Sequence, residues 1–216
     1  MARRKSTNLS PSGKPQSGPG TASSRNGRGT GELRIIGGDW RSRKLRFPDA
    51  GGVRPTPART RETLFNWLSF HLAGSDCLDL FAGSGALGLE ALSRGASSAT
   101  LVDHTPALAK ALRDNLRLLK SDGGEVVCSD VESYLRQRSR PPFDIVFMDP
   151  PFRQGWLEKL FPLLEKQAWI KPGGWVYVEH ESELPTPAGP VCWHLHRQKS
   201  AGQVTYSLFR VIADPE

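Results

Sequence analysis

The sequence predicts an α/β fold built on a mostly parallel, seven-stranded sheet that ends in an antiparallel hairpin. Two observations support this prediction. Between Cys77 and Glu179, short apolar runs alternate with segments of helical periodicity, which is typical of βα units and a parallel sheet. The last two apolar runs, Cys192–His196 and Val204–Val211, have no helical segment between them. Antiparallel neighbours need only a turn, so these two runs are expected to form the hairpin.

The first part of the chain differs from the rest in composition. Residues 1–31 are rich in Gly, Ser and Pro and nearly lack large apolar side chains, so we expect a disordered basic tail. Residues 32–72 are expected to form a small N-terminal extension. It begins with Leu33–Ile36 and Lys44–Phe47, which should pair as a β-hairpin.

A helix is expected to complete the extension. Thr56 is suited to cap it, and Pro57 fits its first turn. Apolar residues then recur at helical spacing, at Leu64, Phe65, Leu68 and Leu72. The extension therefore ends in a helix that buries one face.

Residues 73–216 are predicted to form the main domain. The expected strands are Cys77–Phe81, Ala99–Val102, Val126–Cys128, Phe143–Met148, Trp175–Glu179, Cys192–His196 and Val204–Val211. The expected helices are Leu87–Arg94, Pro106–Leu119, Val131–Arg138 and a segment around Leu157–Leu164. Because proline lacks the backbone donor, we expect this last helix to be kinked or shortened at Pro162. Lys171–Gly174 should form a turn before the fifth strand.

The positive charge is concentrated near the N-terminus. The whole chain has a net charge of +7, but residues 1–31 alone carry +6 and residues 32–60 carry +4, which leaves −3 for residues 61–216. A basic segment attached to a slightly acidic body is suited to holding a polyanion such as a nucleic acid.

The remaining composition excludes several classes of protein. Cys77, Cys128 and Cys192 form no C-x-x-C pair and the histidines show no ligand spacing, so we expect neither a metal site nor a disulfide framework. Free cysteines fit a reduced, cytoplasmic protein. No apolar stretch is long enough to span a membrane, and we expect a monomer.

The most informative motif is Asp149-Pro150-Pro151-Phe152, which follows the predicted strand Phe143–Met148. The two prolines end the strand abruptly because neither can donate a ladder hydrogen bond. This places a carboxylate, a rigid corner and an aromatic ring at the carboxyl edge of the sheet, where ligands bind in open α/β folds. These groups suit a planar base that bears an exocyclic amine.

A glycine-rich turn follows the first strand of the main domain. Gly83, Gly85 and Gly88 fit the spacing of a nucleotide-binding turn, and Asp103 follows the next strand. Two ligands suit this pattern, a dinucleotide and S-adenosylmethionine. Asp79, just before the turn, favours the second, because a carboxylate attracts an ammonium group but repels a pyrophosphate. Asp130 ends the third strand and could accept a hydrogen bond from adenine, or cap a helix.

The order of these motifs resembles that of S-adenosylmethionine-dependent amino-methyltransferases with a Rossmann-like fold. Further stretches are similar to the RsmD-type bacterial 16S ribosomal RNA guanine-N2 methyltransferases, and the resemblance covers residues 33–211. They are Gly37–Leu45, Arg54-Pro55-Thr56, Arg59–Leu68, Asp79–Arg94, His196-Arg197 and Ala201–Val204. Two positions depart from that family's pattern: Ala58 replaces a frequent Asp, and Asp103 replaces the usual Glu.

The resemblance implies roles for particular residues and a substrate, 16S rRNA or a partly assembled small ribosomal subunit. The implied catalytic residues are Asp149, Pro150, Pro151 and Phe152. The implied cofactor-binding residues are Asp79, Phe81, Ala82, Gly83, Ser84, Gly85, Asp103 and Asp130. The expected RNA-binding residues are Arg41, Arg43, Lys44, Arg54, Arg59, Arg61, Arg197 and Lys199.

Three other functions fit part of the sequence. An NAD-dependent oxidoreductase would explain the glycine turn and Asp103, but neither Asp79 nor the motif at Asp149. An amino-methyltransferase acting on adenine N6 in DNA or on a protein glutamine would keep the chemistry and change the substrate. A non-catalytic RNA-binding factor would leave the intact motifs unused.

Overall fold

The computed structural model describes residue 1 and residues 29–49, 55–137 and 140–212. The expected disordered tail falls almost entirely outside these ranges. The strands are β1 (Thr30–Arg34), β2 (Lys44–Pro48), β3 (Asp76–Asp79), β4 (Ser98–Asp103), β5 (Gly124–Cys128), β6 (Phe143–Met148), β7 (Ile170–Glu181), β8 (Trp193–Ala201) and β9 (Val204–Val211). The helices are α1 (Ala58–Trp67), α2 (Gly88–Ser93), α3 (Pro106–Leu119), α4 (Val131–Arg136) and α5 (Trp156–Lys166).

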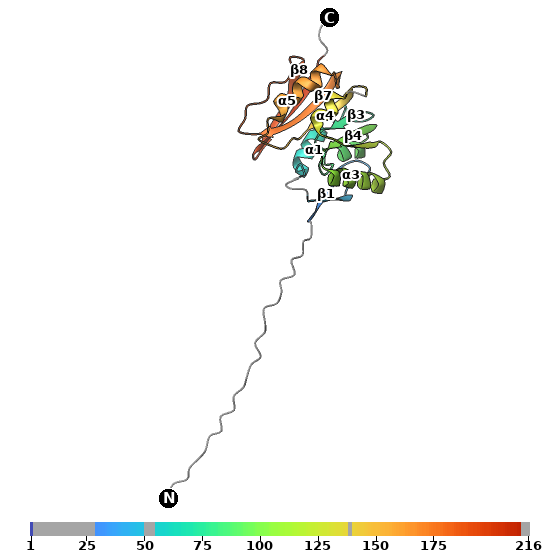
Figure 1. Ribbon diagram of the computed structural model, residues 1–216, viewed down its shortest axis with the longest axis vertical. Coiled ribbons are helices and arrows are strands. Elements are labelled where there is room, and N and C mark those ends of the chain that lie inside the picture. The colour runs from blue at the N-terminus through green and yellow to red at the C-terminus, as the bar shows by residue number, and fades with distance from the viewer. Residues whose placement is uncertain (2–28, 50–54, 138–139, 213–216) are drawn as a thin grey trace.

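Seven strands form one mixed sheet in the order β5-β4-β3-β6-β7-β9-β8 (Figure 1). β3 pairs in parallel with β4 and with β6, whereas β9 runs antiparallel to β7 and to β8. The predicted parallel sheet with a C-terminal hairpin is therefore confirmed. The strand order reverses between β3 and β6, and the carboxyl edge at such a point is where α/β sheets bind ligands.

Helices cover both faces of the sheet because strand residues alternate between them. Ile145 and Phe147 of β6 pack into a cluster with side chains of α1, α2 and α3. Val146 and Met148 pack into a second cluster with side chains of α4 and α5. Each central strand is thus buried on both sides, which explains its continuous apolar sequence.

The hairpin β1–β2 forms a separate small sheet beside α3, at the end of the body shown low in Figure 1. Leu33 and Leu45 face each other in its register and are fully buried in the main core. The side chain of Asn115 on α3 donates a hydrogen bond of 3.0 Å to the carbonyl of Arg46. The extension is therefore packed onto the main domain.

Two expectations were wrong: that α5 is shortened at Pro162 and that a turn at residues 171–174 precedes β7. α5 continues through Pro162, since the proline is exposed on the outer face while Leu160, Phe161 and Leu164 hold the helix against the sheet. Residues 171–174 lie within β7 instead of before it. The register with β6 shifts across this segment, from Phe143 opposite Ile170 to Ile145 opposite Trp175, so the turn is accommodated as an irregularity in the strand.

Among the described residues, no helix is long and apolar enough to cross a membrane. The same part of the chain contains no group of three or more His, Cys, Asp or Glu side chains that could hold a metal ion.

Candidate active site

The turn between β3 and α2 brings backbone amides to the carboxyl edge of the sheet. A Cβ at Gly85 would lie 2.5 Å from Leu89 Cδ1, and its φ of +83° suits glycine. A Cβ at Gly88 would lie 2.1 Å from Leu101 Cδ2 on β4. Because only glycine fits these two positions, the turn stays tight and α2 starts close against the sheet.

Asp79 ends β3 under this turn and is 1% exposed. Its Oδ2 accepts a hydrogen bond of 3.0 Å from the Gly88 amide, whereas its Oδ1 has no partner among the described residues. Burial raises the pKa of Asp79 to about 7, and the hydrogen bond from Gly88 opposes this shift. A buried carboxylate oxygen without a donor is costly, so this atom is suited to receive a cation or donor from a ligand.

Asp103 ends β4, and both of its carboxylate oxygens accept backbone hydrogen bonds. Oδ2 accepts from the Gly83 amide at 2.9 Å, and Oδ1 accepts from the Thr105 amide at 2.7 Å. Asp103 therefore holds the glycine turn in place, and each oxygen keeps a second lone pair for a ligand hydroxyl.

Asp130 follows β5 and caps α4. Its Oδ1 accepts a hydrogen bond of 3.0 Å from the Ser133 amide, and the side chain is exposed. The capping role that the sequence allowed is thus present, and a ligand contact would have to use the other oxygen.

The other loop residues line the same turn. Ala82 and Ser84 are buried, and the Ala82 amide donates a 2.9 Å hydrogen bond to the Val102 carbonyl. Phe81 is half-buried and packs edge-on against Trp156 of α5, with ring centroids 5.5 Å apart. Phe81 and Trp156 therefore form an aromatic surface beside the glycine turn.

Asp149 follows β6, next to Asp79 at the point where the strand order reverses. The hydroxyl of Thr56 donates a hydrogen bond of 3.0 Å to its Oδ2. Thr56 was expected to cap α1, but the cap position is occupied by Pro57 and no side chain caps the helix. Burial raises the pKa of Asp149 to about 6, and the hydrogen bond from Thr56 opposes this shift. The extension thus contacts the central carboxylate directly.

The residues after Asp149 differ in exposure. Pro150 is buried, Pro151 is exposed, and the Phe152 ring is 37% exposed. An aromatic side chain of this size that stays accessible beside a carboxylate offers a stacking surface for a planar ligand.

Glu179 is a second carboxyl at this edge, and the sequence analysis did not identify it. Met148 of β6 pairs with Val178 of β7, so the next residues, Asp149 and Glu179, are neighbours on adjacent strands. The hydroxyl of Tyr177 donates a 2.7 Å hydrogen bond to Glu179 Oε1. Burial, followed by the nearby charge of Asp149, raises the pKa of Glu179 well above its usual range. An acid that ends an apolar strand is the sequence feature that could have identified it.

A cavity of about 400 Å³ lies between the start of α1 and the β8–β9 hairpin. Its lining residues are Pro57, Arg59, Thr60, Glu179, Lys199, Ser200, Ala201, Gly202, Val204 and Tyr206. Pro57 is adjacent in sequence to Thr56, and Glu179 is adjacent in the sheet to Asp149, so the cavity lies beside the central carboxylate. Two of the predicted RNA-binding residues, Arg59 and Lys199, line it.

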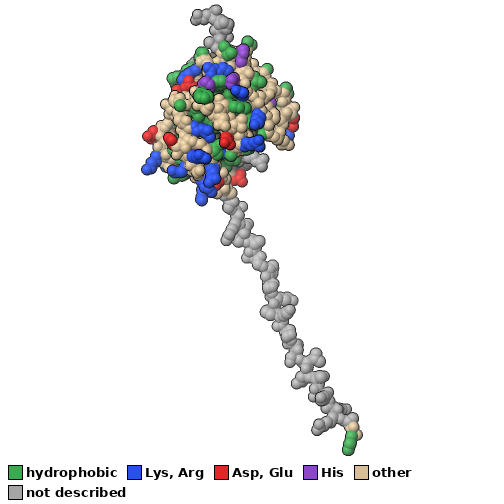
Figure 2. All heavy atoms as spheres, turned by 180° about the vertical axis from the view of Figure 1, so that it is seen from behind, with side chains coloured by type: hydrophobic (Ala, Val, Ile, Leu, Met, Phe, Trp, Pro, Cys, Tyr) green, Lys and Arg blue, Asp and Glu red, His purple; other side chains and the backbone are tan. Residues whose placement is uncertain are grey.

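The other predicted RNA-binding residues lie in different places. Arg41, Arg43 and Lys44 are exposed on the hairpin extension, and Arg197 is exposed on β8. The space-filling view shows Lys and Arg side chains gathered at the end of the body where this hairpin lies (Figure 2). Arg54 lies outside the described residues.

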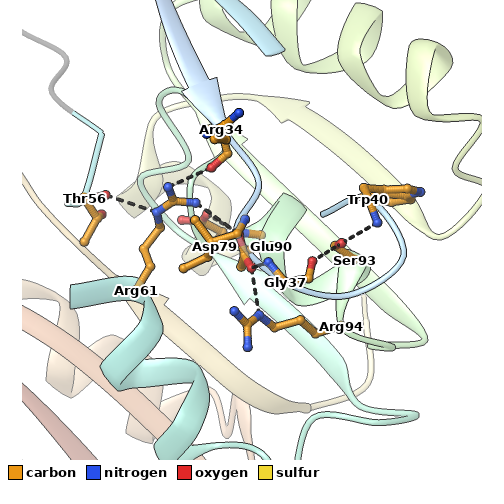
Figure 3. A network of polar contacts seen from close by, with 11 residues as sticks. Arg34, Gly37, Trp40, Thr56, Arg61, Asp79, Glu90, Ser93 and Arg94 are labelled. Carbon is orange, nitrogen blue, oxygen red and sulfur yellow. Dashed lines mark hydrogen bonds and ion pairs between the residues drawn. The ribbon is translucent and has the colours of Figure 1, made fainter. Parts of the chain in front are cut away.

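Arg61 is buried, contrary to the expectation that it meets RNA. It is 3% exposed, and its Nη1 donates a hydrogen bond of 3.1 Å to Glu90, which is fully buried (Figure 3). Its other nitrogens donate to the carbonyls of Thr56 and Arg34. Glu90 also accepts from the Gly37 amide, so Arg61 joins the extension to α2, and each of its three guanidinium nitrogens already has a partner within the protein.

Comparisons with known proteins agree with this arrangement. A family model described as Conserved hypothetical protein 95 matches residues 33–210. The Escherichia coli (strain K12) protein named Ribosomal RNA small subunit methyltransferase D is 51% identical over 191 residues, which are 88% of this chain and 96% of that protein. The Haemophilus influenzae protein of the same name is 44% identical, over 83% of this chain and 94% of that protein.

A solved Escherichia coli structure has a TM-score of 0.79 and 48% identity, and the match covers 85% of this chain and all of that one. These comparisons confirm the family that the sequence motifs indicated. The chain therefore belongs, with the Ribosomal RNA small subunit methyltransferase D proteins, to the family described as Conserved hypothetical protein 95.

Proposed function

We propose that this protein is a methyltransferase that uses S-adenosylmethionine to methylate the exocyclic N2 amine of a guanine in 16S ribosomal RNA. One observation carries the proposal: Asp149, with its Pro-Pro-Phe corner, lies beside buried Asp79 and the glycine turn at one edge of the sheet. The names of the similar proteins, which are small-subunit ribosomal RNA methyltransferases, support the substrate.

Asp79 would hold the methyl donor through its amino group. Its unpaired Oδ1 fits an ammonium, and the positive charge would favour the ionised form of this carboxyl. Phe81, Ala82, Gly83, Ser84 and Gly85 would line the methionine part. Asp103 would accept from the ribose hydroxyls, and Asp130 from the adenine amine. When bound, S-adenosylmethionine supplies an electrophilic methyl group on a sulfonium.

Asp149 and the Pro150 carbonyl would accept the two hydrogens of the guanine amine. The N2 lone pair of guanine is delocalised into the ring, and these acceptors favour a more tetrahedral nitrogen that directs its lone pair outward. Phe152 would stack on the base once it is turned out of the RNA. Alignment of the two reacting atoms can contribute about 7–11 kcal/mol in favourable cases, so Asp149 need not act as a strong base.

The exposed basic side chains would hold the RNA phosphates. Arg41, Arg43 and Lys44 on the extension, with Arg197 on β8, would contact RNA outside the cavity, and Arg59 and Lys199 line the cavity itself. The tail of residues 1–31 would add nonspecific attraction. We propose that the protein acts as a monomer in the cytoplasm, on rRNA or a partly assembled small subunit.

The geometry disfavours the oxidoreductase. In that function the phosphates of a dinucleotide would lie at the glycine turn, where the unpaired carboxylate oxygen of Asp79 would repel them. If the methyl acceptor were adenine N6 or a protein glutamine, the same Asp149 and Pro150 would bind its amine. The site geometry therefore does not distinguish these substrates from guanine, and the experiment below does.

The test is mass spectrometry of 16S rRNA from a strain that lacks this protein. We expect the loss of one N2-methylguanine, restored by the wild-type gene and not by Asp149→Ala. The Asp149→Ala protein should still bind S-adenosylmethionine. A strain whose 16S rRNA keeps every N2-methylguanine, or an Asp149→Ala variant with near-normal methyl transfer, would contradict the proposal.

A further inference from the structure

Asp149 and Glu179 form a pair of carboxyls on one face of the sheet. They follow Met148 and Val178, which are directly opposite each other, and adjacent strands lie about 4.8 Å apart. Phe147 and Tyr177, two residues earlier, contact each other on the α1 face, so the alternation of side chains brings both carboxyls to that face. Two acceptor groups therefore stand side by side next to the cavity.

The surroundings of Glu179 leave one of its oxygens available to a ligand. The Tyr177 hydroxyl occupies Oε1, and within the described ranges no residue hydrogen-bonds to Oε2. Glu179 is 3% exposed, yet it lines the cavity. A buried polar group at a cavity wall needs a donor from whatever fills the cavity.

Guanine is the RNA base that presents two neighbouring donors on its Watson–Crick edge, the N1–H and the N2 amine. Adenine presents one donor beside one acceptor, cytosine presents one donor beside two acceptors, and uracil presents one donor between two acceptors. Enzymes that act on a base turned out of the stack read this edge with hydrogen bonds. A pair of carboxyls, which are acceptors when ionised, matches the guanine edge and no other.

We propose that Glu179 determines specificity for guanine by accepting its N1–H while Asp149 accepts a hydrogen of the N2 amine. This inference rests on the proposed function and deepens it, because it assigns the choice of base to a named residue. Arg59 and Lys199 line the same cavity and add positive charge to its walls.

Without a bound base, the pair is electrostatically unfavourable. Burial and the charge of Asp149 raise the pKa of Glu179, so the ionised form of this carboxyl is disfavoured until a donor reaches it. The titratable groups around this carboxyl are Asp149 and Tyr177, which affect its pKa, Tyr206, which lies opposite it on β9, and Arg59 and Lys199, which line the same cavity. The two guanine donors favour the ionised form, so binding of the base should lower the pKa of Glu179.

Glu179→Gln together with 2-aminopurine tests the assignment. 2-Aminopurine keeps the N2 amine of guanine, but its N1 is an acceptor that would face the Glu179 carboxylate. Glutamine keeps an oxygen for the Tyr177 hydroxyl, removes the charge and offers an amide donor to that N1. 2-Aminopurine also lacks the O6 of guanine. This loss affects the wild type and Glu179→Gln equally, so it cancels when the preference of each protein for guanine over 2-aminopurine is compared.

The measurement is the dissociation constant of guanosine 5′-monophosphate and of 2-aminopurine riboside 5′-monophosphate, in NMR titrations of the full chain. We expect the wild type to prefer the guanosine nucleotide by roughly tenfold to a hundredfold, the range for a hydrogen bond to a charged group. Glu179→Gln should lower this preference by about tenfold or more. Glu158→Gln, the same change at an exposed carboxylate on α5, should leave it unchanged.

Thermal melting shows whether each variant is folded. If Glu179→Gln fails to fold, Glu179→Asp is measured in its place. Its shorter carboxylate should weaken binding of the guanosine nucleotide by roughly tenfold. An unchanged preference in a folded Glu179→Gln, unchanged binding in Glu179→Asp, or a wild type that does not favour the guanosine nucleotide would overturn the assignment. A wild type that transfers no methyl group to rRNA would instead contradict the proposed function.

Discussion

Asp79 combines a role in binding with a cost in stability. Its carboxyl is buried with one unpaired oxygen, and its pKa rises from 3.8 to about 7. In the folded protein the group holds a proton that the unfolded chain releases at lower pH. The free energy of unfolding therefore falls as the pH rises from 3.8 towards 7. The total loss is on the order of a few kcal/mol.

We predict that Asp79→Asn stabilises the cofactor-free protein and weakens cofactor binding. The melting temperature should rise at a pH above the folded-state pKa of about 7 and change little below 3.8, because only the ionised form is costly. Calorimetry should show S-adenosylmethionine binding weakened by roughly tenfold or more, since the charged partner of the ammonium is lost. Equal affinity in both proteins would contradict the role of Asp79.

Thr56 is a positioning residue for Asp149. Its hydroxyl donates to the carboxylate and favours the ionised form, which partly opposes the rise in pKa caused by burial. The sequence suggested a helix cap because Thr56 precedes Pro57, and capping is a local property. The actual partner lies 93 residues away, which no local pattern could reveal.

Removal of this hydrogen bond should shift the pH profile of methyl transfer. In Thr56→Val the pKa of Asp149 should rise above about 6, so the acidic limb of kcat/KM should move to higher pH. The rate at neutral pH should fall by roughly threefold to tenfold, the value of one hydrogen bond. Thr56→Ser keeps the hydroxyl and should restore the wild-type profile. A profile identical in all three proteins would remove Thr56 from the site.

The bounds of helices and strands that are set by residues close together in the sequence were predicted well. α3 and β6 have the expected bounds, because each is defined by its own apolar periodicity and by prolines or polar residues at its ends. Contacts between elements were predicted poorly. Arg61 looks like a surface cation in sequence, and only the packing of α1 against α2 places it against Glu90.

The Arg61–Glu90 pair should be necessary for the stability of the extension. Arg61→Met removes one of the two cations that pair with buried Glu90, and Arg94 remains 2.7 Å from it, so the free energy of unfolding should fall by about 1.5–3 kcal/mol, the value of a hydrogen bond to a charged group. Glu32→Gln breaks an exposed pair with Lys44 and should cost about 1 kcal/mol or less. Denaturant unfolding measures both. If Arg61→Met were as stable as Glu32→Gln and mainly lost RNA affinity, the original assignment of Arg61 to RNA would be correct.

At the scale of the whole molecule, the sheet order creates the site. β3, β6 and β7 are neighbours in space but separated in the chain by α2–α5 and two other strands. Their carboxyl ends bring together Asp79, Asp149 and Glu179. The first two were predictable from adjacent motifs, whereas Glu179 is followed by no motif and becomes visible only once the register is known. Family resemblance alone indicated guanine at first, and this carboxyl pair offers a physical reason for it.

The division of charge along the chain predicts how RNA binding depends on salt. Six basic residues and no acidic residue lie in residues 1–31, whereas residues 61–216 are slightly acidic. Each phosphate contact with single-stranded RNA contributes about 0.7 to the slope of log affinity against log salt. Deleting residues 2–28 should therefore flatten the slope by up to about 4, while methyl transfer at low salt continues because the site is intact.

Two variants separate charge from sequence in this tail. A tail with the same residues in shuffled order should keep the wild-type slope, because nonspecific attraction depends on charge and not on order. A tail with its Lys and Arg replaced by Gln should behave like the deletion. In Arg41→Gln with Arg43→Gln, the slope should fall by only about 1.4. A shuffled tail that binds as poorly as the deletion would show that the tail reads a specific RNA feature, and the charge argument would then be wrong.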